Sequence, residues 1–314
     1  MLPSAIVLAG LVAFLVAALV HAARVRVLRA AEGADPRARA RWLLGLIAAP
    51  IATGVAVVLV AVGHCLVPRL LGIEDDCFSD SLAGCAFCLF GQQRGGVMAW
   101  ALAGLTVLPL LRQLAASALG VVSARRARAR LQRIARPGPH GSWHVPGAGA
   151  FVVGWGEPVV CLGESLTAAL DDRAVRAVSA HEDEHLSRGD LWLRSAARIL
   201  AAGHLPATRR ALLDALDLAT EQACDERAGE VVADRLVVAQ ALLDAARLQV
   251  GGGGCLPAAL DARISALCMH PDAAVSSPWA SRVSLALAVA LCASLWWSHQ
   301  VHRVAETVAL LLTR

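Results

Sequence analysis

Long hydrophobic stretches separated by charged segments dominate the pattern along the chain. The first runs from Leu2 to about Ala22, the second from Trp42 to about Leu71, and the third from Val97 to about Leu114. Each comes close to the ~20 helical residues that cross the hydrocarbon core of a bilayer. A shorter fourth stretch, from about Trp279 to Trp297, has tryptophans at both ends, as membrane interfaces favour. The pattern predicts transmembrane helices over about 2–22, 42–71 and 97–114, and a fourth within residues 279–314.

Between the third and fourth stretches, residues 123–278 have the pattern of a separate, mixed α+β domain. Two β-branched runs, Phe151–Val153 and Pro158–Leu162, flank a Gly-Trp-Gly turn and predict a β-hairpin. A helix is expected from Leu166 to Ser187, because Gly189 is a stop signal. Further helices are expected at about 190–202, 207–218, 219–232 and 234–248, and residues 256–275 predict a loosely structured return to the membrane. The predicted fold class is mainly α, with one small sheet.

Composition supports a membrane protein, and the charges give it an orientation. The 314 residues are 57% hydrophobic and only 17% charged, whereas soluble domains have about 25% charged residues. Residues 23–41 and 125–136 each hold six arginines, but residues 72–95 hold four acidic residues and only Arg94. Because arginine excess marks cytoplasmic segments, residues 123–278 are expected in the cytoplasm and both termini outside. Residues 123–136 predict a basic helix lying against anionic headgroups, and the net charge of +4 gives no argument for nucleic acid binding.

Cysteines fit the same orientation. Four of the nine lie in or beside the outer segment 72–95, where disulfides persist: Cys65, Cys77, Cys85 and Cys88. Two bridges among them allow three pairings, which the sequence does not distinguish.

The stretch AHEDEHLSRGD at residues 180–190 carries the candidate chemistry. His181 and His185 are four residues apart, so one helical face presents both imidazoles. Glu182 follows the first histidine, as in the His-Glu-x-x-His motif of zinc hydrolases, where this glutamate is the general base. The motif alone also fits a solvated charged helix. A catalytic zinc site requires a third protein ligand.

A candidate third ligand lies 36 residues after His185, in TEQACDERAGE. Glu221 could complete the ligand set if a later helix returns beside the first. Asp225, one turn further, is placed to accept a hydrogen bond from a ligand imidazole and so fix its tautomer.

Three segments together resemble the membrane peptidases of the BlaR/MecR antirepressor family, which are gluzincins. They are GAFVVGWGEPVVCLGESL, AVSAHEDEHLSRGDLW and EQACDERAGE, and the three-plus-one arrangement of spans is also similar. The resemblance implies a zinc metallopeptidase domain that cleaves a cytoplasmic protein such as a transcriptional repressor. It implies His181, His185 and Glu221 as zinc ligands and Glu182 as the base. It also implies that a substrate peptide adds as a strand along Pro158–Leu162.

The chain departs from the family in two respects. Asp183 stands where the family usually has an apolar residue, and Glu184 follows it. Only residues 298–314 follow Trp297, so no penicillin-binding sensor domain is expected and beta-lactam sensing is not implied. The chain also has no tyrosine to stabilise an oxyanion, and His204 is a weak candidate for that role.

Other functional classes remain open at the level of sequence. Membrane gluzincins of the heat-shock and prenyl-processing types share the zinc motif, and a non-catalytic signalling scaffold could keep the fold. A protease with its motif inside a span is disfavoured by the polar sequence around His181. A transporter is disfavoured because ionisable residues cluster outside the spans.

Overall fold

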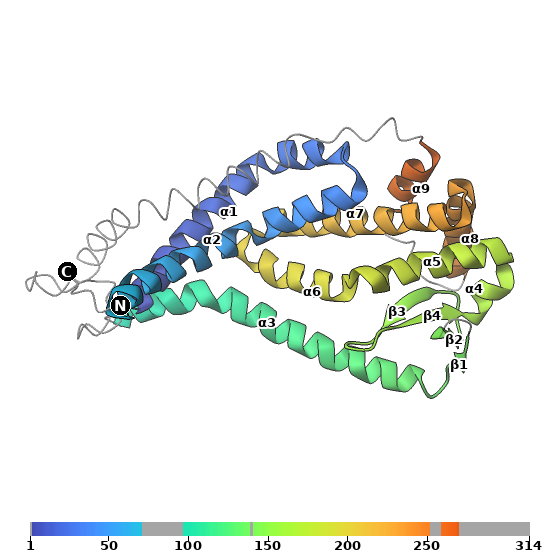
Figure 1. The fold of residues 1–314 in the computed structure, drawn as a ribbon, viewed down its shortest axis with the longest axis horizontal. Helices are drawn as coiled ribbons and strands as arrows, with labels where there is room; N and C mark the ends of the chain where they lie inside the picture. Colours follow the sequence, from blue (N-terminus) through green and yellow to red (C-terminus); the bar gives the residue numbers. More distant parts are fainter. Residues whose placement is uncertain (1, 71–96, 139–140, 252–258, 270–314) are drawn as a thin grey trace, which may run out of the picture.

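The computed structural model describes residues 2–70, 97–138, 141–251 and 259–269. The predicted fourth span and the cysteine-rich segment 72–95 lie outside these residues. Three long helices meet at one end of the described structure, and a small sheet lies toward the opposite end, with the other helices between and beside them (Figure 1).

The long helices are α1 (Leu2–Glu32), α2 (Pro36–Leu70) and α3 (Val97–Leu131). Among the described residues, these three are long and apolar enough to cross a membrane. Large apolar side chains such as Phe14 and Leu105 are 57% and 66% exposed, as expected of a surface that faces lipid. Membrane association is therefore supported by the structure as well as by the sequence.

These helices extend well beyond the predicted spans. At 1.5 Å per residue a helix of 35 residues is about 52 Å long, against ~30 Å for a bilayer core. The arginine-rich residues 23–41 were expected to connect two spans as a loop. They are instead the end of α1, a short turn and the start of α2. Asp35 in the turn caps α2 by accepting a hydrogen bond from the backbone N–H of Ala38 at 2.9 Å. Alanine, leucine and arginine favour helix strongly enough to continue both elements. The basic segment after the third span likewise continues α3 to Leu131, along the same helix.

The three long helices approach closely at small residues. A Cβ on Gly10 would lie 2.6 Å from Thr106 of α3, and a Cβ on Gly54 would lie 3.2 Å from the carbonyl oxygen of Ala9. Small residues allow such approach between helices in lipid, where packing takes the place of the hydrophobic effect.

The sheet has four short strands: β1 (Arg136–Pro137), β2 (Trp143–Val145), β3 (Ala150–Val153) and β4 (Val159–Gly163). The predicted hairpin is confirmed, since β3 pairs antiparallel with β4 and Phe151 lies opposite Cys161. The strand order is β1-β2-β4-β3, with β2 and β4 parallel. Both sides of β4 are therefore occupied, and the expectation that a peptide adds along Pro158–Leu162 is wrong. The edge strand of the hairpin is β3.

Six further α-helices and a 3₁₀ turn complete the described part of the chain. They are α4 (Glu164–Ala169), α5 (Asp172–Arg188), α6 (Asp190–Leu200), a 3₁₀ turn η3 (Ala201–Gly203), α7 (Pro206–Val232), α8 (Arg235–Gly251) and α9 (Leu260–Cys268).

Three boundaries differ from the sequence-based expectation. The helix expected from Leu166 to Ser187 is broken at Leu170, because Asp171 caps a new helix by accepting from Ala174 N at 2.7 Å. The helices expected at 207–218 and 219–232 are one continuous helix, α7. The segment 256–275, expected to be loosely structured, contains α9.

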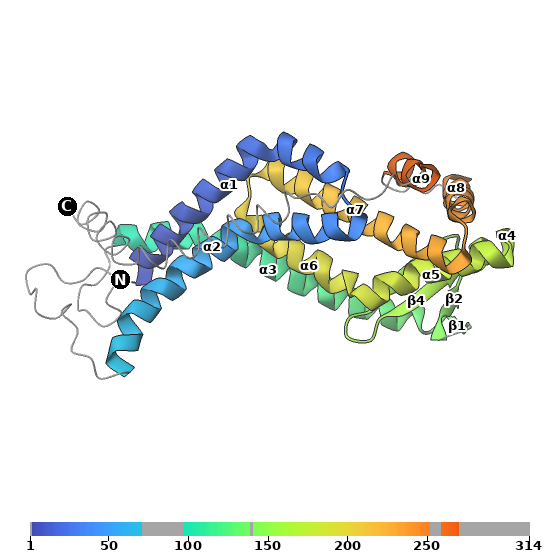
Figure 2. The same ribbon diagram turned by 45° about the horizontal axis from the view of Figure 1, so that its top comes forward.

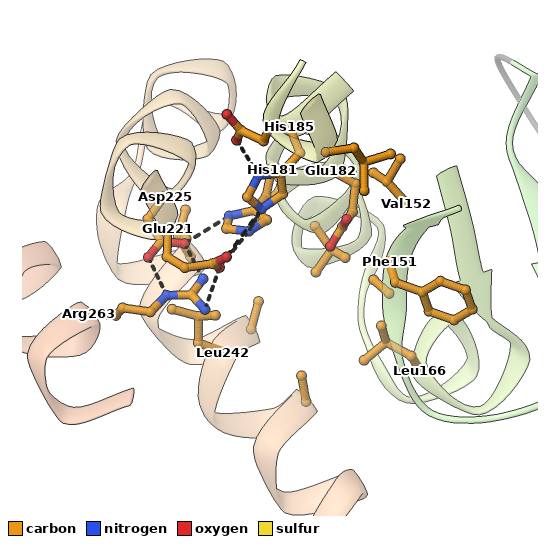
Figure 3. Close-up of a pocket in the computed structure, with 18 of the residues that line it drawn as sticks. Phe151, Val152, Leu166, His181, Glu182, His185, Glu221, Asp225, Leu242 and Arg263 are labelled. Atoms are coloured by element: carbon orange, nitrogen blue, oxygen red, sulfur yellow. Dashed lines mark hydrogen bonds and ion pairs between the residues drawn. The ribbon is translucent and has the colours of Figure 1, made fainter. Parts of the chain in front are cut away.

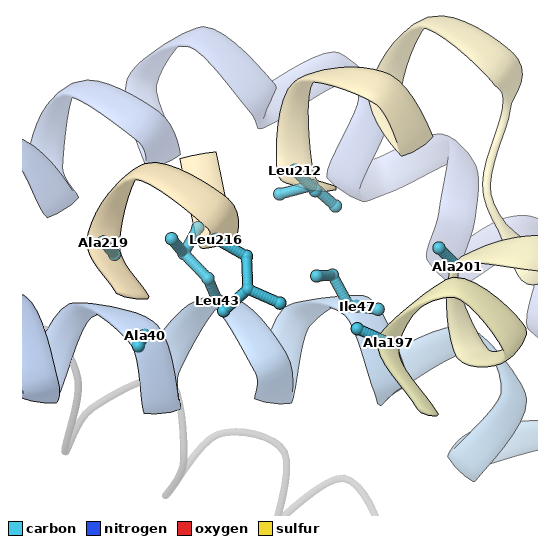
Figure 4. Close-up of a cluster of buried hydrophobic side chains, with 8 residues drawn as sticks. All are labelled: Ala40, Leu43, Ile47, Ala197, Ala201, Leu212, Leu216 and Ala219. Carbon is cyan, nitrogen blue, oxygen red and sulfur yellow. The ribbon is translucent and has the colours of Figure 1, made fainter. Parts of the chain in front are cut away.

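The first half of α2 is buried against α6 and α7 (Figure 4). Leu43 and Ile47 of α2 are fully buried and pack against Leu212 and Leu216 of α7 and Ala197 of α6. The first half of α2 thus shares a core with α6 and α7, and α7 carries Glu221. In both views α7 and α6 lie along α2 (Figures 1 and 2).

His204 lies in this junction and not at the motif. Its Nε2 is 3.1 Å from the carbonyl oxygen of Leu46 and 3.2 Å from that of Ile47, and the side chain is buried. The expectation that His204 stabilises an oxyanion is therefore wrong.

Candidate metal centre

Helix α5 places the two motif histidines on one face. Asp171 begins the helix and Gly189, in the left-handed conformation at φ 66°, ends it. The rings of His181 and His185 meet edge to face, and their Nε2 atoms are 3.2 Å apart. Two imidazole nitrogens therefore converge on one point, as the spacing predicts.

Helix α7 returns alongside α5 and brings Glu221 to the same point (Figure 3). Its carboxylate oxygens lie 3.4 Å from His181 Nε2 and 3.6 Å from His185 Nε2. Zinc bonds of about 2.0–2.1 Å in a tetrahedron place neighbouring ligand atoms ~3.3–3.4 Å apart. The two Nε2 atoms, 3.2 Å apart, and Oε2 of Glu221, 3.4 Å from His181 Nε2, fit this spacing, and the other oxygen, Oε1, lies 3.6 Å from His185 Nε2. Nitrogen and carboxylate donors are also a ligand set that zinc takes, so these residues fit the metal that the resemblance implies.

In each histidine the ring nitrogen that faces away from the proposed metal position, Nδ1, has a carboxylate partner. His181 Nδ1 lies 2.9 Å from Asp225 Oδ1, as expected, and His185 Nδ1 lies 2.6 Å from Asp190 Oδ2. Asp190 is the first residue of α6 and is buried beside His185. A hydrogen bond from Nδ1–H to each carboxylate would leave Nε2 as the atom that binds a metal ion.

Among the described residues, a second group that could hold a metal ion consists of His185, Asp190 and Cys224. Its His185–Asp190 separation of 2.6 Å is that of a hydrogen bond and is too short for two ligands of one zinc ion. Cys224 is buried with its sulfur 3.3 Å from His185 Nδ1, so it packs behind the ligand ring. We therefore place the candidate site at the Nε2 atoms.

Two arginines join the site from elements that the sequence did not connect with it. Arg263 of α9 binds Asp225 in a bidentate pair at 2.7 and 2.6 Å, and its Nη1 is 3.1 Å from Glu221. Arg194 of α6 is 2.5 Å from the other oxygen of Glu221. The residues that neighbour an arginine in the sequence do not indicate which distant carboxylate it will contact. Residues 256–275 were expected to be loosely structured, so no helix that could carry Arg263 to the site was expected there.

The charges around the site favour a positive charge between the ligands. Burial by itself lowers the pKa of His181, but its bonds to Asp225 and Glu221 outweigh burial and raise that pKa to about 9. Burial raises the pKa of Glu221, yet the bond to His181 and the charge of Arg263 hold it well below its usual range. Glu221 is therefore an anion, as a metal ligand must be.

Glu182 lies beside the ligands in a cavity of about 360 Å³. Its side chain is buried, and burial raises its pKa although the nearby His181 and His185 lower it. Figure 3 shows its carboxylate on the side of the histidines that faces β3. An apolar wall of the cavity is formed by β3, α4 and α8, and its larger members are Phe151, Val152, Leu166, Val238 and Leu242.

The unusual acids of the motif lie away from this cavity. Asp183 is exposed, and Glu184 is 3.8 Å from Arg37 of α2 and 3.0 Å, through its carbonyl oxygen, from the Ser187 hydroxyl. Neither residue lines the cavity. The departure from the family pattern thus concerns the contact between α5 and α2, and leaves the ligand face unchanged.

Comparison of the chain with known protein families, with curated proteins and with solved structures finds no match in any of the three.

Proposed function

We propose that the chain is a membrane-embedded, zinc-dependent endopeptidase of the kind that the BlaR/MecR-like motifs imply. The observation that carries this proposal is the convergence of His181, His185 and Glu221 at separations of 3.2, 3.4 and 3.6 Å, with Glu182 beside them in one cavity. A solvated helix would have no reason to bury His181 and Glu182 and to hold His185 against a partly buried Glu221. The test is whether Glu182→Gln keeps the metal and loses proteolysis.

His181, His185 and Glu221 would hold the zinc ion, and Asp225 and Asp190 would orient the two imidazoles. A bound zinc ion would polarise the scissile carbonyl and make a bound water more acidic. Glu182 is the residue placed to accept a proton from the attacking water and to deliver it to the leaving amine. Its raised pKa suits a group that must both take up and release a proton.

The edge strand β3 is the place where a substrate peptide can add. Ala150, Phe151 and Val152 line the cavity, and β3 is at the end of the strand order. An extended peptide gains main-chain hydrogen bonds from such an edge, and pockets beside it select alternate side chains. The proposed substrate is therefore a protein segment that is extended at the cleavage site, and a cytoplasmic repressor is the substrate that the resemblance implies.

The apolar wall of the cavity predicts a preference for an apolar side chain next to the scissile bond. Leu242 of α8 forms part of this wall. We expect Leu242→Ala to lower kcat/KM about 10-fold for peptides with leucine or phenylalanine at that position, because apolar pocket contacts discriminate by ~1–3 kcal/mol. Zinc content should not change.

The control for this prediction is Leu236→Ala, since Leu236 lies in the first turn of the same helix and is 64% exposed. Initial rates on a peptide library with one varied position would measure both variants. Equal losses in the two variants, or a loss that is the same for polar and apolar peptides, would remove the specificity assignment.

We also propose that the peptidase domain is cytoplasmic and that the N-terminus is outside. The arginine clusters at both ends of the α1–α2 turn and at the end of α3 support this orientation. A reporter fused after Arg136 is expected to report a cytoplasmic position. A reporter that is active only on the outer side would invert the arrangement.

A further inference from the structure

The amide of Gln222 connects a membrane helix with the helix that supplies Arg263. Gln222 follows the proposed ligand Glu221 in α7, and its side chain is largely buried. Its Oε1 accepts a hydrogen bond from the guanidinium of Arg39, near the start of α2. Its Nε2 donates to the carbonyl oxygen of Ala262 in α9 at 3.1 Å.

Arg39 fixes which way this amide points. A guanidinium only donates, so it must face the oxygen of the amide, and the NH₂ group is then directed to the carbonyl of Ala262. Without Arg39, the amide of Gln222 can turn over, and an oxygen facing the carbonyl oxygen of Ala262 would repel it.

Helix α9 depends on such anchors. It has nine residues and its first turn lacks a side-chain cap. Isolated helices of this length are not stable in water. Among its residues, Arg263 and Leu267 are buried: Leu267 packs with α5, α7 and α8, and Arg263 binds Asp225 and Glu221. The bond from Gln222 to Ala262 holds the backbone at the position directly before Arg263.

We infer that Arg39 is a positioning residue for the metal centre, acting through Gln222 on α9 and thereby on Arg263, Asp225 and Glu221. The effect on zinc binding rests on the proposed function, whereas the anchoring of α9 rests on the hydrogen bonds of Gln222 alone. Because Arg39 belongs to α2, the same contacts connect the position of a membrane helix with the support of the metal ligands. Figures 1 and 2 show α9 beyond the α1–α2 turn, next to α8.

The test compares four full-length proteins in detergent: wild type, Arg39→Ala, Gln222→Ala and the double variant. Competition with a chelator measures zinc affinity, and hydrogen exchange of residues 259–268 in metal-free protein measures the anchoring of α9. We expect each single variant to bind zinc about 3- to 10-fold more weakly than wild type. Removing a group that bonds directly to a metal ligand typically weakens binding by about 10–100-fold, and Arg39 acts less directly. The double variant should be no weaker than the single ones, because both break one chain of contacts. Exchange of residues 259–268 should become faster in all three.

Two further variants separate positioning from general destabilisation. Arg39→Lys keeps a donor and is expected to recover most of the zinc affinity. Arg41→Ala removes an exposed arginine two residues along the same helix and should leave both measurements unchanged.

The inference is overturned if Arg39→Ala matches wild type in exchange of residues 259–268. It is also overturned if the losses in Arg39→Ala and Gln222→Ala add in the double variant. A wild-type protein that binds no zinc would instead contradict the proposed function, while the exchange measurement would still decide the role of Arg39.

Discussion

Glu182→Gln is expected to lower kcat by about 10²–10⁴-fold, the usual contribution of a general acid–base group, while the protein keeps its zinc. The substitution removes the proton acceptor but preserves the shape of a side chain that is buried beside the ligands. It leaves His181, His185 and Glu221 unchanged, so the affinity for zinc should stay close to that of wild type. Cleavage of a fluorogenic peptide library, together with metal analysis of the same sample, would measure both effects.

Glu184→Gln is the matched control for this result. Glu184 lies two residues further along the same helix, near Arg37 and outside the cavity. The Glu184→Gln variant should cleave peptides at close to the wild-type rate. If Glu182→Gln cleaves as fast as Glu184→Gln, Glu182 is not the base.

The second large effect is expected at Asp225. Its side chain is only 2% exposed and pairs with Arg263, which is 7% exposed, and with His181 at 2.9 Å. Asp225→Ala leaves the guanidinium of Arg263 buried without its main partner, and breaking a buried pair in this way costs about 3–5 kcal/mol. Denaturant unfolding in detergent should show that loss, and zinc affinity should fall about 10- to 100-fold because the tautomer of His181 is no longer fixed.

The pH dependence of this effect has a defined sign. Burial raises the pKa of Asp225, but its bonds to Arg263 and His181 outweigh burial and bring the pKa below its ordinary value of 3.8. The stabilisation is therefore complete above the unfolded-state pKa and is lost as the pH falls through the lower folded-state pKa. The part of the difference between wild type and Asp225→Ala that comes from this carboxylate should shrink in acid. The part that comes from its pair with His181, whose pKa is raised to about 9, should be lost as the pH rises through that value.

Asp244→Ala provides the surface comparison for Asp225→Ala. Asp244 pairs with Arg247 at 2.9 Å, but the arginine side chain is 71% exposed. Exposed pairs contribute about 0–1 kcal/mol, so this variant should unfold almost as wild type does. Equal losses for the two aspartates would show that burial of the Asp225–Arg263 pair has no special importance.

The sequence predicted the parts of the site that depend on local spacing. His181 and His185 share a face because four residues separate them on one helix, and the hairpin before them follows from β-branched runs around a glycine turn. Glu221 and Asp225 could be predicted because they are also four residues apart, and the separation of 36 residues between His185 and Glu221 is enough for a later helix to return beside the first. The structure brings all four together.

The parts that sequence did not predict depend on contacts between distant segments. The strand order places β4 inside the sheet, and no local pattern distinguishes it from the edge strand β3. Arg194 and Arg263 reach Glu221 from helices on either side of α7 in sequence. The burial of Leu43 and Ile47 could not be read from the second hydrophobic stretch, since lipid and a protein core favour the same apolar residues.

The most direct test of the account is the zinc content of the purified full-length protein, measured beside His185→Ala. The account predicts about one zinc per wild-type chain, since the site offers one set of three convergent ligands, and loss of that zinc in His185→Ala. A folded wild-type protein that takes up no zinc on reconstitution would contradict the central claim, and so would a His185→Ala variant that binds zinc as tightly as wild type.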